Sequence, residues 1–170
     1  MHRVKIGTVL FDQAKGAAIV TLVDEAGRRI LPIFIGLWEG MAIFRELNRA
    51  PAPRPMLHDL FCHVLLGFGA RLEKVIVDTL RDNTFYARLY VRQQDAAVVI
   101  DARPSDAIAL AVKCQAPIYV AEEVLAAAGK VEEELTAEEK APEERREAPS
   151  TEDVRAWLEN LRPEDFADPH

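Results

Sequence analysis

The segment that most constrains the fold comprises residues 98–112, because it changes from an extended to a helical pattern within a few positions. Residues 98–100 form an apolar run typical of a strand, whereas residues 107–112 place apolar side chains at helical spacing. Between them, Pro104 fixes one backbone angle and disfavours helical geometry at the preceding residue. The chain is therefore expected to pass from a strand into a helix through a rigid corner at residues 101–106.

Four polar residues lie in or beside this corner: Asp101, Arg103, Ser105 and Asp106. Ser105 is a candidate N-cap, and Asp106 would sit favourably at the positive end of the helix. Helix capping thus explains Ser105 and Asp106 as well as a catalytic role would. Arg103 and Asp101 are harder to assign to capping. A guanidinium held at a helix N-terminus is well placed to bind a phosphate, since helix N-termini favour anions.

The chain has 170 residues, 49% of them apolar, which is enough for one sizeable core and an appendage. Its net charge of −7 is unevenly distributed. Residues 130–170 contain 14 acidic and 6 basic side chains, while residues 1–129 contain 14 acidic and 15 basic ones. The body is therefore nearly neutral, and the acidity of the whole chain does not exclude a nucleic-acid partner.

Three regions follow from the composition. Residues 1–129 form the expected folded domain. Residues 130–149 are rich in Glu, Ala, Lys, Arg and Pro, cannot repay their ordering entropy and are expected to form a flexible acidic linker. Residues 150–170 repeat apolar residues at helical spacing, which predicts a short C-terminal helix. Such a helix would be marginal alone, so we expect it to dock on the body or on a partner subunit.

Within the body, alternating and helical patterns follow one another. Strands are expected at residues 2–12, 17–23, 29–36, 70–80, 85–91, 98–100 and 117–120, and helices at 37–49, 56–68, 107–112 and 121–128. Asp82 and Asn83 predict a tight turn, and Gly129 a helix-terminating glycine. Prolines 51, 53 and 55 predict a stiff connector. The whole predicts an α+β fold, a mainly antiparallel mixed sheet with about four helices packed on it.

The second predicted helix should bury its apolar residues, which are Leu57, Leu60, Phe61, Val64, Leu65 and Phe68. Cys62 and Cys114 lie in apolar helical patterns and are interpreted as small buried side chains, not as a disulfide, which fits a reducing cytosol. The N-terminus lacks a signal-peptide pattern, and no apolar run approaches the roughly 20 residues that a membrane span needs. We therefore expect a soluble cytoplasmic protein that does not associate with membranes.

Five passages, in order, resemble the bifunctional nuclease family, whose name reflects activity on DNA and RNA. They are residues 31–36 (LPIFIG), 53–60 (PRPMLHDL), 82–89 (DNTFYARL), 101–110 (DARPSDAIAL) and 116–120 (APIYV). The resemblance covers roughly residues 3–129, and residues 161–166 resemble the C-terminal extension of bacterial members. Phe34 stands where Trp is common, and residues 38–40 replace a more usual polar or small run. The resemblance implies an α+β domain, nuclease activity, a nucleic-acid partner and a homo-oligomer, dimeric or higher.

A nuclease must activate water and neutralise charge on the phosphate, often with Mg²⁺. The sequence has no HNH-like pair and no Cys/His cluster with zinc spacing. The candidate catalytic residues are Arg103 for phosphate charge, Asp101 or Asp106 for metal or water, and His58 for proton transfer beside Asp59. His58 and Asp59 equally fit a structural helix start.

The remaining candidates would bind substrate or metal. Substrate contacts are expected from Arg54, Arg81, Tyr86 and Arg88, although the first two also fit a structural clamp and a solvated turn. Alternation should turn Phe85 and Leu89 to one side and Tyr86, Arg88 and Tyr90 to the other. Asp78 and Asp101 come from strands and could together bind Mg²⁺ or another divalent cation. Glu39 could be a third carboxylate or a favourable charge at a helix start.

The alternative is a non-enzymatic oligomeric module. Its charged motif residues would form a salt-bridge network that supports an interface, for which an arginine among carboxylates is equally suitable. The nearly neutral body favours this alternative, since affinity for a polyanion comes mainly from Lys and Arg. Convergence of the side chains in an open pocket would favour the enzyme, and full burial of Arg103 against Asp101 or Asp106 the network.

Overall fold

The computed structural model describes residues 1–26, 29–50 and 52–131. The predicted C-terminal helix, and the predicted linker from residue 132 onward, lie outside the described residues. The four helices are α1 (Leu37–Leu47), α2 (Leu57–Gly67), α3 (Pro104–Cys114) and α4 (Glu122–Ala128). The strands are β1 (His2–Asp12), β2 (Ala17–Asp24), β3 (Arg29–Gly36), β4 (Ala70–Arg81), β5 (Thr84–Gln93), β6 (Ala96–Ala102), β7 (Ile118–Val120) and β8 (Lys130–Val131).

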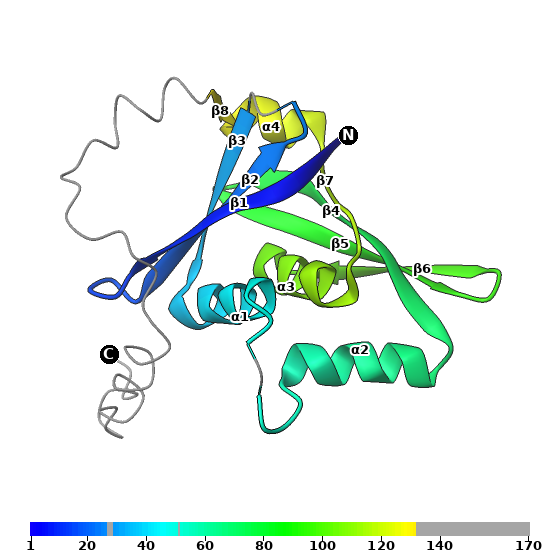
Figure 1. Cartoon of the computed structure of the whole chain (residues 1–170). Coiled ribbons are helices and arrows are strands. Elements are labelled where there is room, and N and C mark those ends of the chain that lie inside the picture. Colours follow the sequence, from blue (N-terminus) through cyan, green and yellow to red (C-terminus); the bar gives the residue numbers. More distant parts are fainter. Residues whose placement is uncertain (27–28, 51, 132–170) are drawn as a thin grey trace. The chain divides into compact units, whose positions relative to one another are not determined.

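The strands form one mixed sheet in the order β6-β5-β4-β7-β1-β2-β3-β8. Every described pairing is antiparallel except β4 with β7, which is parallel (Figure 1). The short strand β7 thus joins two antiparallel groups, β4–β6 and β1–β3. The predicted α+β fold with a mainly antiparallel mixed sheet and four helices is confirmed. A helix able to span a bilayer does not occur among the described residues.

Helix α3, which follows the predicted corner, is the most buried helix. It contacts α1, α2, β4 and β5, and seven of its eleven residues are buried: Pro104, Ser105, Ala107, Ile108, Ala109, Leu110 and Ala111. Its many alanines let the neighbouring elements approach closely. The strand-to-helix corner therefore leads directly into the core.

Helix α1 packs through small residues. Gly40 and Ile43 are its buried residues, and a Cβ atom at Gly40 would collide with Ala18 on β2 and press against Phe11 on β1. Leu47, the last residue of the helix, is exposed. The helix therefore lies close to the sheet at Gly40. Fewer of its apolar residues are buried than the helical pattern predicts.

The predicted buried face of α2 is wrong for four of its six residues. Phe61 and Leu65 pack against the core, but Leu57, Leu60, Val64 and Phe68 are 73%, 54%, 45% and 71% exposed. The helix packs against α3 and β4. Because apolar residues surround most of its circumference, periodicity alone could not identify the inner side.

Cys62 on α2 and Cys114 on α3 form a disulfide, so the predicted pair of free thiols is wrong. The two Cα atoms are 6.6 Å apart, within the range that a disulfide spans. The residues are 52 positions apart in the sequence, and only the packing of α2 on α3 brings them together. Local sequence patterns carry no information about that contact.

Two predicted turn features have different outcomes. Asp82 and Asn83 both have positive φ, 49° and 57°, as a two-residue hairpin turn with the right twist requires. Gly129 does not adopt the left-handed geometry of a helix-terminating glycine, because its φ is −71° and its ψ 137°. Instead, a Cβ atom there would collide with the carbonyl oxygen of Leu125, so glycine permits a close backbone approach.

Candidate functional site

The predicted site residues lie in three separate places. One is a pocket on the sheet, which contains Asp78, Arg81, Tyr86, Arg88 and Asp101. The second is the helix corner, where His58, Arg103 and Asp106 meet Glu39. The third is a recess beside the proline connector, which contains Arg54 and Asp59. The sequence grouped Asp101 with Arg103, and the structure separates them.

The sheet pocket has a volume of about 180 Å³ and is lined by Asp78, Thr79, Arg81, Tyr86, Arg88 and Asp101. Residues directly opposite in antiparallel strands point to the same face. Arg88 on β5 is opposite Asp101 on β6, so both share one face. Ala87 and Leu89 are buried on the other face, as the predicted alternation of β5 requires. The strand register thus places charged side chains from β4, β5 and β6 on one face of the sheet. This face is opposite the one on which Ala87 and Leu89 are buried.

Arg88 is the central cation of the sheet pocket. Its Nε forms an ion pair with Asp78 Oδ2 at 2.8 Å, and the Thr79 hydroxyl donates a hydrogen bond to Asp78 Oδ1 at 3.0 Å. Asp101 is exposed, and neither a hydrogen bond nor an ion pair joins its side chain to another described residue. The pocket therefore presents one paired carboxylate, one unpaired carboxylate and a half-exposed guanidinium.

The sheet pocket offers two carboxylates as ligands for a metal ion. The described residues contain no group of three or more His, Cys, Asp and Glu side chains able to hold a metal. Asp78 and Asp101 are two oxygen donors, which is compatible with Mg²⁺ because this ion usually keeps several waters and takes one or two carboxylates. The donors do not fit a zinc site.

At the helix corner, Arg103 contacts two carboxylates. Its Nε and Nη2 donate to the two oxygens of Asp106 at 2.7 and 3.1 Å, and its Nη1 donates to Glu39 Oε1 at 2.9 Å. These contacts, Asp106 foremost, raise the pKa of Arg103. Arg103 is itself the extended N-cap residue of α3, so the prediction that Ser105 caps the helix is wrong, and Ser105 is buried inside the first turn.

His58 lies beside this ion-paired group. Its Nε2 atom is buried without a hydrogen-bond partner and lies 3.9 Å from Asp106 Oδ1. The Arg103 side chain is 65% exposed, so the helix corner is open to solvent on the arginine side. It links α1 to α3 through Arg103 and Glu39, with His58 beside it. Asp101, two residues before Arg103, faces the sheet pocket instead.

Arg54 and Asp59 line the recess, which has a volume of about 740 Å³. Asp59 accepts a hydrogen bond from the Met56 backbone at 2.8 Å and pairs with Lys113 on α3. Lys113, followed by the Met56 amide, lowers the pKa of Asp59. Lys113 also pairs with Glu46 on α1 at 3.2 Å. Asp59 therefore has a structural role at the start of α2. This role is one of the two interpretations that the sequence allowed.

Comparison with known proteins identifies the family. The model of the bifunctional nuclease domain matches residues 20–133. The chain belongs to the bifunctional nuclease domain family. An uncharacterized protein of Mycobacterium tuberculosis is 34% identical over 166 residues, which cover 98% of each chain. Bifunctional nuclease 1 of Oryza sativa subsp. japonica is 26% identical over 114 residues, 65% of this chain and 34% of that protein. Bifunctional nuclease 2 of Arabidopsis thaliana is 28% identical over 123 residues, covering 71% and 37%.

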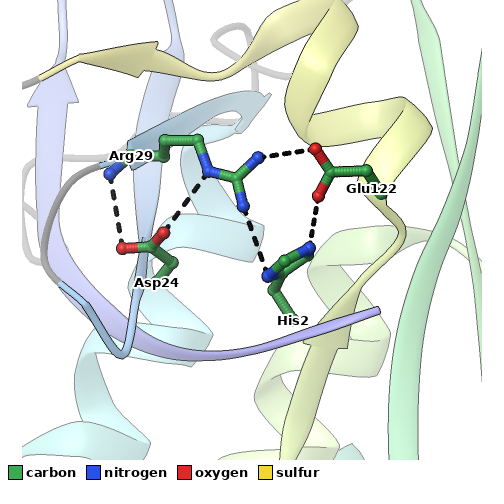
Figure 2. Close-up of polar contacts among 4 residues, drawn as sticks. All are labelled: His2, Asp24, Arg29 and Glu122. Carbon is green, nitrogen blue, oxygen red and sulfur yellow. Dashed lines mark hydrogen bonds and ion pairs between the residues drawn. The ribbon is translucent and has the colours of Figure 1, made fainter.

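The chain also contains a polar network that sequence reasoning missed (Figure 2). Arg29 on β3 donates to Asp24 Oδ2 at 3.4 Å and to Glu122 Oε1 at 2.9 Å, and its Nη2 lies 3.2 Å from His2 Nδ1. His2 Nε2 contacts the other oxygen of Glu122. Arg29 lowers the pKa of Glu122. Apart from the neighbouring Asp24 and Arg29, these residues are far apart in sequence, and the set forms no motif.

The network determines the tautomer of His2. Because an arginine nitrogen can only donate, His2 Nδ1 must accept from Arg29, so the ring proton lies on Nε2 and is donated to Glu122.

The carboxylate of Asp24 is buried, with its side chain only 7% exposed. The network therefore connects β1, β2, β3 and α4 around one arginine.

Proposed function

We propose that the protein is a nuclease that hydrolyses phosphodiester bonds in DNA or RNA, and that the reaction takes place at the sheet pocket. The observation that carries this proposal is the convergence of Asp78, Arg81, Tyr86, Arg88 and Asp101 in one pocket. Membership of the bifunctional nuclease domain family supports the reaction class. The helix corner supports it less, because both of its carboxylates are already paired with Arg103.

Each residue of the pocket has a role in this proposal. Arg88 offsets the negative charge that the phosphate gains in the transition state. Asp101, the unpaired carboxylate, accepts a proton from the attacking water. Tyr86 is 40% exposed and can stack on a base, and Arg81 contacts a neighbouring phosphate.

Asp78 and Asp101 are the proposed ligands of a hydrated Mg²⁺ ion. When bound, such an ion offsets phosphate charge and lowers the pKa of a coordinated water. Asp78 would then share its carboxylate between the ion and Arg88, with which it already forms an ion pair. Omitting Mg²⁺ should therefore abolish most of the cleavage, and adding a chelator should do the same.

The test is a cleavage assay with highly purified protein on single-stranded DNA and RNA in the presence of Mg²⁺. Asp101→Asn should lower kcat about 100-fold or more, because an amide cannot accept the proton. Asp95→Asn, at an exposed turn outside the pocket, is the matched control and should cut at the wild-type rate. Unchanged cleavage by Asp101→Asn would refute this site. Loss of cleavage in a folded Asp106→Asn protein but not in Asp101→Asn would assign catalysis to the helix corner instead.

The cytoplasmic location is also a proposal. The disulfide between Cys62 and Cys114 would be unusual in a reducing compartment. Trapping the thiols in intact cells with an alkylating reagent before lysis tests whether the protein is cytoplasmic. Alkylation of both cysteines supports the cytoplasm, and a protected pair argues for an oxidising compartment.

A second candidate function is the non-enzymatic homo-oligomeric module. It is favoured by the exposed apolar residues of α2 and by β6, which ends the sheet and exposes Val98 and Val99. An exposed apolar edge strand can pair with the same strand of a second copy about a two-fold axis. Analytical ultracentrifugation should then show a dimer or larger assembly that Leu57→Ser and Val99→Lys dissociate. A monomeric wild-type protein at micromolar concentration would refute it.

A further inference from the structure

The recess beside the proline connector contains three arginines without a counter-ion. Arg45, Arg49 and Arg54 line it, and no hydrogen bond or ion pair joins their side chains to another described residue. We call this site, defined by these three arginines with Lys113, the basic recess. It is distinct from the sheet pocket, with which it shares no lining residue.

The acidic residues of the basic recess do not neutralise the arginines. Glu46 and Asp59 both line it, and both pair with Lys113. Contact with Asp59 and Glu46 raises the pKa of Lys113, so this group stays charged and holds both carboxylates. The three arginines therefore present uncompensated positive charge towards one concave space, although the chain as a whole has a net charge of −7.

Local backbone geometry restricts two of these arginines, Arg49 and Arg54. Arg49 follows the end of α1 and has a φ of 50°, a left-handed geometry in which its amide bonds to the Glu46 carbonyl at 3.1 Å. Arg54 stands between Pro53 and Pro55, whose rings restrict the connector. Like charges that are gathered by a stiff backbone repel one another, and a bound anion removes this repulsion.

The size and walls of the basic recess define the class of anion. A volume of about 740 Å³ is in the range of small-molecule and cofactor sites. Apolar side chains from Leu47, Met56 and Val112 also line it, beside the charged groups. The recess thus combines guanidinium groups that can bind adjacent phosphates with apolar surface that can contact a planar ring.

We propose that the basic recess binds a nucleoside di- or triphosphate. Arg45, Arg49 and Arg54 bind the phosphate groups, and the apolar side chains contact the base. This site lies outside the proposed catalytic pocket, so its ligand is not the scissile phosphodiester. The proposal does not depend on the proposed nuclease activity.

Isothermal titration calorimetry on the full chain tests the proposal with three probes: ADP, inorganic pyrophosphate and adenosine. ADP should bind most tightly, pyrophosphate more weakly and adenosine not measurably. The double variant Arg49→Ala/Arg54→Ala should weaken ADP binding by about 100-fold, because each charge-assisted contact accounts for roughly a factor of ten or more. Arg71→Ala, an exposed arginine on β4 outside both sites, is the matched control and should bind ADP like the wild type.

Three results would overturn the proposal: no ADP binding, equal binding of ADP and adenosine, or equal ADP binding by the double variant. A single-stranded oligonucleotide that displaces ADP, together with a raised KM for cleavage in the double variant, would overturn the small-ligand assignment in favour of a strand-binding surface. Cleavage that depends on Asp101 while ADP fails to bind would refute this inference alone. ADP binding without any cleavage would support it and refute the proposed nuclease.

Discussion

Arg88 on β5 forms an ion pair with Asp78 on β4, 2.8 Å between Nε and Oδ2, and this ion pair defines the sheet pocket. On the other side of Arg88, the directly opposite residue of β6 is Asp101. A guanidinium with a carboxylate on each neighbouring strand can contact an incoming phosphate while it keeps one internal partner. The pair thus connects the register of three strands with the proposed chemistry.

The first prediction concerns the shape of this cation. Arg88→Lys keeps the charge but loses the planar fork that contacts a carboxylate and a phosphate together. We expect kcat/KM for cleavage to fall about 100-fold while the fold is retained, as removal of one transition-state donor does elsewhere. Arg92→Lys is the matched control, because Arg92 lies on the same strand and pairs with Glu73 outside the pocket. Equal losses in both variants would contradict a specific role for Arg88.

The strands could be predicted from the sequence because their alternation and turns are local properties. The hairpin of β4 and β5 follows from the pattern and from Asp82 and Asn83. The inner side of α2 could not be predicted, because Leu57 and Phe61 are equally apolar and only tertiary packing distinguishes them. The Cys62–Cys114 disulfide depends on the same packing.

The candidate site was predictable only in part. Asp78 and Asp101 were expected as a strand pair, and both line one pocket because register places β4 and β6 on either side of β5. Asp101 and Arg103 were expected together because they are close in sequence. They separate because Asp101 still belongs to β6 and shares the outer face with Arg88, while Arg103 begins the helix on the inner face.

The second prediction concerns pH and Asp59. Lys113 and the Met56 amide lower the pKa of Asp59 from its usual value of about 3.8. A lowered folded-state pKa stabilises the protein above the unfolded-state pKa, and this stabilisation is lost as the pH falls through the folded-state value. Asp59→Asn should therefore be less stable than the wild type at pH 7, and the difference should shrink below about pH 4.

Urea unfolding of the wild type and of Asp59→Asn between pH 7 and pH 3 measures this difference. The control is Asp95→Asn, an exposed turn carboxylate that has no described partner and should differ little from the wild type at any pH in the series. A stability difference for Asp59→Asn that stays constant down to pH 3 would show that the ionised carboxylate is not the origin of the effect.

The third prediction concerns the network around Arg29. Arg29→Met removes the guanidinium and leaves the buried carboxylate of Asp24 without that partner. We expect the free energy of unfolding to fall by about 1–3 kcal/mol, the usual cost of leaving a buried polar group with fewer partners. Thermal denaturation measures the loss. Arg3→Met is the control, since Arg3 pairs with Glu25 while its side chain is 59% exposed, and it should change stability by less than about 1 kcal/mol.

The last prediction concerns the link between α2 and α3. Cys62→Ala removes the disulfide but keeps a small apolar side chain at a buried position. In the oxidised protein it should lower the free energy of unfolding by about 2–4 kcal/mol, because the bridge restricts the unfolded chain. With a reducing agent, the difference should contract to the smaller packing cost of the missing sulfur. Urea unfolding with and without reductant measures both values, and a thiol titration that finds two free cysteines in the untreated protein would contradict the bridge.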